Sequence, residues 1–111
     1  MFNQKKGVWI MRIMMIVRVP HAKFNAAVGD GSVESKMKTI LDETKPEAAY
    51  FTELEGLRAV VILANLEKPS MIPALAEPWF LAFEAKVEFH VVMSPEELGQ
   101  AGLDKIGSRW A

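Results

Sequence analysis

The feature that most constrains this chain is a β-rich run over residues 8–19, which Pro20 ends. Successive side chains of a strand point to opposite faces of its sheet. One side of this strand is apolar throughout and carries Trp9, Met11, Ile13, Met15, Val17 and Val19. The other side is apolar at its centre and cationic at two points, with Ile10, Arg12, Met14, Ile16 and Arg18. The first side must be buried, and the second side also needs cover.

Helical patterns follow this strand. Between Pro20 and Asp30 the sequence indicates a short helical connector with Gly29 at its C-cap, and Asp30 or Ser32 can cap the next helix. Residues 33–44 have the apolar spacing of an amphipathic helix, and Pro46 stops it. The apolar stripe of this helix consists of Val33, Met37, Ile40 and Leu41.

Two further strands and a second long helix come next. Residues 47–53 and 57–65 read as strands, and the short link Leu54-Glu55-Gly56 predicts a hairpin. Residues 69–83 have helical composition, and Pro78 predicts a kink or break in that helix. Residues 86–93 read as the fourth strand, with Val87, Phe89, Val91 and Met93 on one face.

The C-terminal segment, residues 94–111, begins with the clearest local signal in the chain. Ser94-Pro95-Glu96-Glu97 has the residues of a capping box with proline at the first helical position, so a helix is expected to start there. Gly99 and Gly102 weaken this helix. Apolar residues continue to the end of the chain and predict that the tail packs on something; they are Leu103, Ile106 and Trp110.

The order β-α-β-β-α-β predicts an α+β fold of the ferredoxin-like plan. Right-handed crossovers then give an antiparallel sheet of order 4-1-3-2 with both long helices on one face and an extra C-terminal helix. We expect one domain over residues 1–111. Met11-Arg12-Ile13 has the character of a natural start, which allows residues 1–10 to be an N-terminal extension.

The predicted sheet has a second face without helices. Strand parity assigns to it Met14, Ile16, Arg18, Glu88, His90 and Val92, Val60 and Ile62 or their neighbours, and further Tyr50 and Thr52. Such a surface would exceed the largest apolar patch usual for a monomer, about 300–600 Å². The hydrophobic fraction of 50% also leaves apolar residues for an interface. We therefore expect a second copy of the chain to cover this face.

Charge and composition exclude several classes of protein. The net charge of −1 is spread over the chain, so no basic stripe exists to neutralise nucleic acid phosphates. The third strand, residues 58–63, lacks the aromatic residues with which an RNA recognition motif stacks bases. Lys5-Lys6 before an apolar run resembles a signal peptide, but Arg12 interrupts that run and no Ala-x-Ala site follows. We expect a cytoplasmic protein with no membrane span.

Three stretches carry a resemblance to a known family: KPEAAYFTE (45–53), IPALAEPWF (72–80) and VEFHVVMSPEEL (87–98). They resemble a family of short bacterial proteins with no established activity, from about Met11 to the end of the chain. The resemblance implies a dimeric α+β barrel. Some members carry the label "panthothenate synthetase", but such ligases resemble the His-Ile-Gly-His nucleotidyltransferases. This chain has neither that motif nor the length for their fold.

Few residues are suited to catalysis. The chain has no cysteine, and its two histidines, His21 and His90, lie in distant segments without metal-ligand spacing, so we expect no metal and no cofactor. His90 shares a predicted face with Glu88, where the imidazole could act as a base, orient a ligand or simply bond across an interface. Arg18 could hold a carboxylate or pair with a glutamate.

Tyr50 and Trp79 complete the candidate ligand site. Its other residues are Arg18, Glu88 and His90. Trp79 follows Pro78 and could wall a pocket or belong to the core. The sequence thus favours a homodimeric small-molecule-binding or interaction domain whose ligand is apolar or carbonyl-containing. The alternative is a cofactor-independent monooxygenase- or isomerase-like enzyme with a pocket on the open sheet face. A closed pocket of about 300 Å³ at these residues would favour the enzyme.

Overall fold

The central element of the fold is the strand β2 (Val8–Val19), which has partners on both edges. A computed structural model describes residues 2–5 and 8–111, and side chains from Ile10 onward. Along one edge β2 pairs antiparallel with β4 (Leu57–Leu66), and along the other with β5 (Lys86–Val91). The longest predicted strand therefore has the bounds that its sequence pattern indicates.

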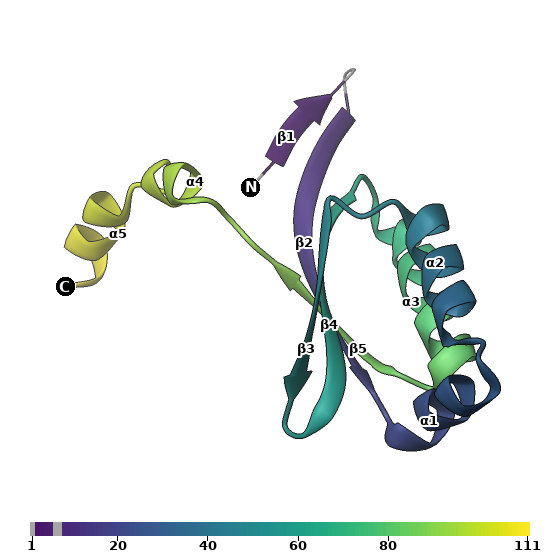
Figure 1. The fold of residues 1–111 in the computed structure, drawn as a ribbon. Coiled ribbons are helices and arrows are strands. Elements are labelled where there is room, and N and C mark those ends of the chain that lie inside the picture. The colour runs from purple at the N-terminus through teal and green to yellow at the C-terminus, as the bar shows by residue number, and fades with distance from the viewer. Residues whose placement is uncertain (1, 6–7) are drawn as a thin grey trace.

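The outer strand β3 (Ala48–Leu54) pairs antiparallel with β4 and completes the order β5-β2-β4-β3. This is the predicted order 4-1-3-2, so the ferredoxin-like α+β topology is confirmed (Figure 1). The hairpin between β3 and β4 is also confirmed. Its two turn residues, Glu55 and Gly56, have φ angles of 55° and 79°, as a type I′ turn requires.

A short strand that the sequence did not predict lies beside the start of β2. This strand, β1 (Phe2–Lys5), pairs antiparallel with β2 from Phe2 opposite Met11 to Lys5 opposite Val8. It belongs to the segment that we interpreted as an extension. β1 and β5 therefore occupy the same edge of β2 one after the other.

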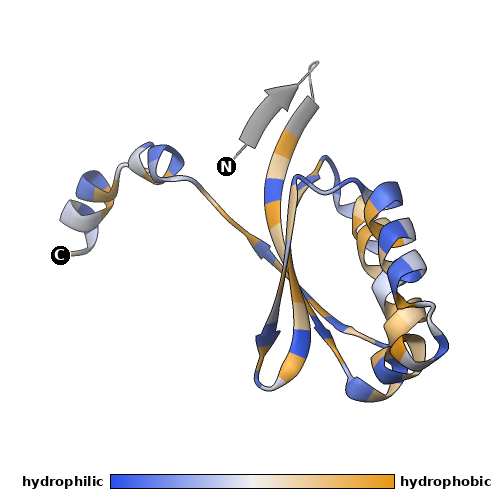
Figure 2. Cartoon of the chain, viewed as in Figure 1, coloured by the Kyte–Doolittle hydropathy of each residue, from blue (hydrophilic) through white to orange (hydrophobic). Residues whose placement is uncertain are grey.

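The helices α1 (His21–Asp30), α2 (Val33–Thr44) and α3 (Ile72–Phe83) cover one face of the sheet (Figure 1). Between them and the sheet lies the core, which contains Met15, Val17, Val60, Trp79 and Phe83. Hydrophobic residues recur along β2 and α3, and α2 presents hydrophilic residues on its outer side (Figure 2). The predicted stripe of α2 faces the core, with Ile40 buried and Val33, Met37 and Leu41 packed against it.

The structure corrects two details of the predicted helices. Gly29 lies inside α1, and Gly31, with φ of 81°, forms the C-cap because the helix continues for one more residue. Of the kink or break predicted near Pro78, the break was wrong, because α3 is continuous from Ile72 to Phe83. An exposed helix face tolerates the lost backbone bond because water can solvate the carbonyl group that it frees, and the Ala74 carbonyl, four residues before Pro78, belongs to an exposed residue.

The predicted capping box is present at the start of the C-terminal segment. The Ser94 hydroxyl accepts a hydrogen bond from the Glu97 amide at 3.2 Å, and the Ser94 amide donates to Glu97 Oε1 at 2.8 Å. The helix that it starts, α4 (Pro95–Gly99), is short, and a second helix, α5 (Leu103–Trp110), follows Gly102. The expected single helix is thus divided at the glycines that weaken it.

The helix α5 stands away from the sheet and from the other helices (Figure 1). Leu103, Ile106 and Trp110 are 58%, 48% and 79% exposed, so the expected packing of the tail does not occur within one chain. The radius of gyration is 17.3 Å, against about 13 Å for a compact domain of this length. In the described part of the chain no helix is long and apolar enough to cross a membrane.

Candidate functional site

The face of the sheet opposite the helices brings together most of the residues that we predicted there. Strand register places Tyr50, Val61, Ile16 and Glu88 in one row across the sheet, and Leu63, Met14 and His90 in the next. Arg18 and Thr52 follow in a third row. We call this surface the open face, because no described helix covers it (Figure 1).

The alternative that placed Val60 and Ile62 on the open face was wrong. Both side chains are buried in the core, and their neighbours Val61 and Leu63 take the open positions. Together with Met14 and Ile16, these neighbours form an apolar stripe of half-buried side chains in the middle of the open face. The open face is therefore apolar at its centre, as the first strand indicated.

Arg18 anchors an ionic cluster at one side of this stripe. Its Nη1 donates to Glu88 Oε2 at 2.5 Å, and its Nε lies 3.4 Å from Glu55 Oε1, within ion-pair distance but poorly aligned for a hydrogen bond. The hydrogen bond from Arg18 lowers the pKa of the Glu88 carboxyl, and the bond to Glu88 raises the pKa of the Arg18 guanidinium. Arg18 is therefore already paired with two carboxylates and is poorly placed to receive a third.

His90 lies at the edge of this cluster. Its Nε2 is 3.9 Å from Glu88 Oε2, a distance that permits an ion pair only when the imidazole is protonated. Tyr50 is in the same row as Glu88 but three strand spacings away, about 14 Å across the sheet. One small substrate could not contact the tyrosine and the ionic cluster together on a flat surface.

The remaining predicted site residue, Trp79, lies in the core. Its side chain is 1% exposed, and its ring centroid is 6.2 Å from that of Phe83. Trp79 lines neither of the two pockets described below. His21, the other histidine, is exposed at the start of α1.

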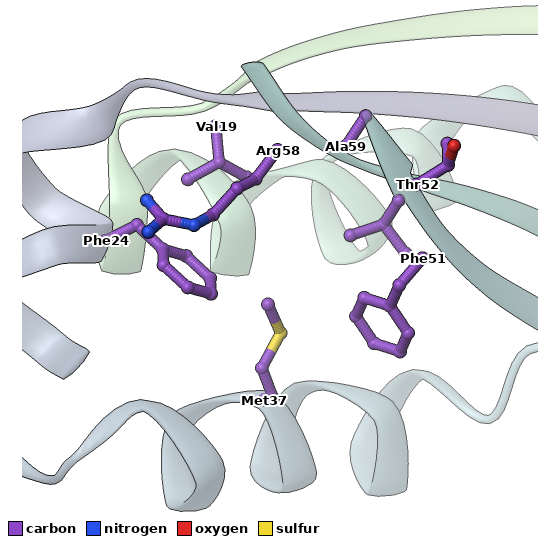
Figure 3. A pocket seen from close by; sticks show the side chains of 8 residues that line it. Val19, Phe24, Met37, Phe51, Thr52, Arg58 and Ala59 are labelled. Carbon is purple, nitrogen blue, oxygen red and sulfur yellow. The ribbon is translucent and has the colours of Figure 1, made fainter. Parts of the chain in front are cut away.

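A pocket that the sequence did not predict opens on the helix side of the sheet. Its volume is about 370 Å³, and its walls come from β2, β3, β4, α1 and α2 (Figure 3). It is lined by Val19, Phe24, Met37, Phe51, Thr52, Arg58, Ala59 and Val60. A smaller pocket of about 270 Å³ lies between the end of α2 and the start of α3. We call the larger one the Arg58 pocket.

The charged group of this pocket is the guanidinium of Arg58. Its Nη1 donates to Asn25 Oδ1 at 2.8 Å, and its Cζ lies 4.5 Å from the centroid of the Phe24 ring. Within the described part of the chain, no carboxylate forms an ion pair with Arg58. The sequence did contain a signal for this pocket. Strand parity places Arg58 on the same side of β4 as Val60 and Ile62, and a cation on an otherwise apolar face indicates a candidate binding site.

None of the five residues of the predicted ligand site lines the Arg58 pocket, and the described residues contain no cluster of three or more metal-ligating side chains. Neither of the two pockets described above, which lie among the residues that the structure describes, contains Arg18, Tyr50 or His90. Comparison of the sequence with family models, and of the chain with curated proteins and solved structures, gave no match. The family resemblance of the sequence stays a prediction.

Proposed function

We propose that this protein is a homodimeric interaction domain in which two copies pack through their open faces. The observation that carries the proposal is the apolar stripe of Met14, Ile16, Val61 and Leu63, over which the described chain places no element. Burying apolar surface is the main favourable term in protein association. A second copy supplies a matching apolar surface, because a twofold axis brings the same patch of both chains together.

The arginines on the open face are compatible with burial because both are paired. Arg18 is paired with Glu88 and Glu55, and Arg12 donates to Glu47 through two nitrogens at 3.2 and 3.3 Å. A buried charge is costly chiefly when it lacks a partner. These cations therefore enter an interface with their counter-charges already in place.

The size of the open face indicates that the sheets alone do not make the whole interface. Four strands about 4.8 Å apart and six residues long, at about 3.4 Å each, give a footprint of about 400 Å². A standard interface buries about 800 Å² on each partner. The C-terminal arm, residues 92–111, offers the missing area because its apolar residues Leu103, Ile106 and Trp110 share one side of α5. We therefore place this arm against the partner copy.

The test is the oligomeric state of matched variants. We expect the purified chain to sediment as a dimer, and Val61→Lys to sediment as a monomer because it places a charge in the centre of the stripe. Leu81→Lys is the control, since Leu81 is 79% exposed on α3, away from the open face. Circular dichroism verifies that each variant is folded. A wild-type chain that stays monomeric at high concentration would refute the proposal.

A further inference from the structure

We infer that the Arg58 pocket binds a small monocarboxylate with an apolar body, such as a single aromatic ring or a short aliphatic chain. The carboxylate would pair with Arg58, and the apolar body would lie between Phe24, Met37 and Phe51 (Figure 3). The pocket is on the helix side of the sheet, and the open face is on the other. This inference therefore goes beyond the proposed dimer and does not depend on it.

The first argument is the state of the arginine. Arg58 is half-buried on an apolar face, and a guanidinium keeps its charge at all ordinary pH values. Arg12 and Arg18, the other two arginines of the sheet, each have a glutamate partner, whereas Arg58 has a neutral amide oxygen and an aromatic ring. A carboxylate ligand would supply the counter-charge that the described residues do not provide.

The guanidinium of Arg58 is also preorganised for binding an anion. It has five N–H donors, of which one is used by Asn25, so enough remain for the two parallel bonds that a carboxylate accepts. The Phe24 ring and Asn25 both hold its plane in place. Because the group is already oriented, less conformational entropy is lost when the ligand binds.

The shape of the pocket limits the ligand to a small molecule. Its volume of about 370 Å³ is at the lower end of the range of roughly 300–1,000 Å³ for ligand pockets. Phe51 is 61% exposed on β3 although it points to the helix side, and a ligand body would cover it. Met37 on α2 has a flexible side chain that can adapt to different apolar shapes.

The charges near the pocket favour a single negative charge on the ligand. Arg58 is the one charged residue among those that line the Arg58 pocket. Glu53 is opposite Arg58 in the strand register, and its Oε2 accepts a hydrogen bond from the Gly56 amide at 3.0 Å. A second carboxylate or a phosphate would therefore find no second cation among the lining residues, and the charge of the neighbouring Glu53 would oppose the added negative charge. A monocarboxylate is the anion that matches this arrangement.

Calorimetric titration with matched probes tests the inference. We expect phenylacetate and hexanoate to bind saturably to the wild-type protein, and their neutral amides, phenylacetamide and hexanamide, to bind about tenfold more weakly or worse, because the amides lack the charge. Arg58→Gln should remove the preference for the acid. Lys68→Gln is the control variant, since it also removes one positive charge but Lys68 is exposed and does not line the Arg58 pocket.

A second variant keeps the test decisive if Arg58→Gln does not fold. Met37→Trp fills the pocket from α2, leaves Arg58 in place and should abolish binding of both acids. Equal affinity for acids and amides would overturn the inference, as would binding that survives both variants or no saturable binding at millimolar concentrations. Sedimentation of the same samples reports the dimer separately, so a failure of one proposal is distinguishable from a failure of the other.

Discussion

Arg18 on β2 donates a 2.5 Å hydrogen bond to Glu88 on β5, which is the residue diagonally across from it in the strand register. The two residues are 70 positions apart in the sequence. β5 pairs with β2 at the edge of the sheet. The contact between Arg18 and Glu88 therefore helps to fix the register of β5 against β2. The hydrogen bond from Arg18 lowers the pKa of Glu88, so the carboxyl loses its proton at a lower pH in the folded chain than in the unfolded chain.

This pKa shift predicts a dependence of stability on pH. A carboxyl with a lowered pKa in the folded state stabilises the fold above its usual pKa, and the contribution is lost as the pH falls through the lowered value. Glu88→Gln should therefore lower the melting temperature at neutral pH. The difference from the wild type should shrink below about pH 4 and also at high salt, because the pair is partly exposed. Melting curves of both proteins across this pH range make the comparison, and a constant difference would contradict it.

The two phenylalanines of α3 give a matched test of the core. Phe83 is fully buried, and its ring lies tilted against that of Phe24 at a centroid distance of 5.5 Å, whereas Phe80 is partly exposed on the same helix. Phe83→Ala should lower the free energy of unfolding by about 3–5 kcal/mol. Phe80→Ala should lower it by less than about 1 kcal/mol. Urea denaturation measures both, and equal losses would show that α3 packs differently.

Two glycines should respond to alanine with opposite signs. Gly56 has a φ of 79° in the β3–β4 turn, so Gly56→Ala should destabilise the fold by about 1 kcal/mol. Gly29 lies inside α1 with no atom within 4 Å of an added Cβ, so Gly29→Ala should stabilise it by about 0.5–1 kcal/mol. Thermal unfolding gives both values. A stabilising Gly56→Ala would mean that the turn is of another type.

The C-terminal arm should matter for association and little for the fold of one chain. A chain that ends at Met93 keeps the sheet and the three helices that form the core. We expect it to remain folded and to dimerise more weakly than the full chain, because Leu103, Ile106 and Trp110 no longer contribute apolar area. Sedimentation over a concentration series measures this. If truncation left the dimer affinity unchanged, the arm would have no part in the interface.

Local patterns were enough to predict the four strands β2 to β5, α2 and the capping box, because each depends on spacing within a few residues. The third strand was harder to orient because apolar residues fall on both of its sides. Alternation alone could not choose between Val60 and Val61. The choice depends on pairing with β2, where Val61 lies opposite Ile16 and Val60 opposite Val17.

The Arg58 pocket could not be found from local spacing either. Arg58 contacts Asn25, 33 residues earlier in the sequence, because α1 lies next to the start of β4. Trp79 shows the reverse case: its sequence context was compatible with a pocket wall or with the core, and only the three-dimensional packing placed it among Phe83 and the strands. Contacts between residues far apart in the sequence therefore determine the positions of both Arg58 and Trp79.

The shared edge of β2 sets the direction in which the tail leaves. The Val92 amide donates to the Arg12 carbonyl at 3.2 Å, and the next position along that edge, Met11, is already paired with Phe2 of β1. β5 can therefore not lengthen past this point without displacing β1. The N-terminal strand β1 thus limits the length of β5, and the chain after Val92 leaves the sheet.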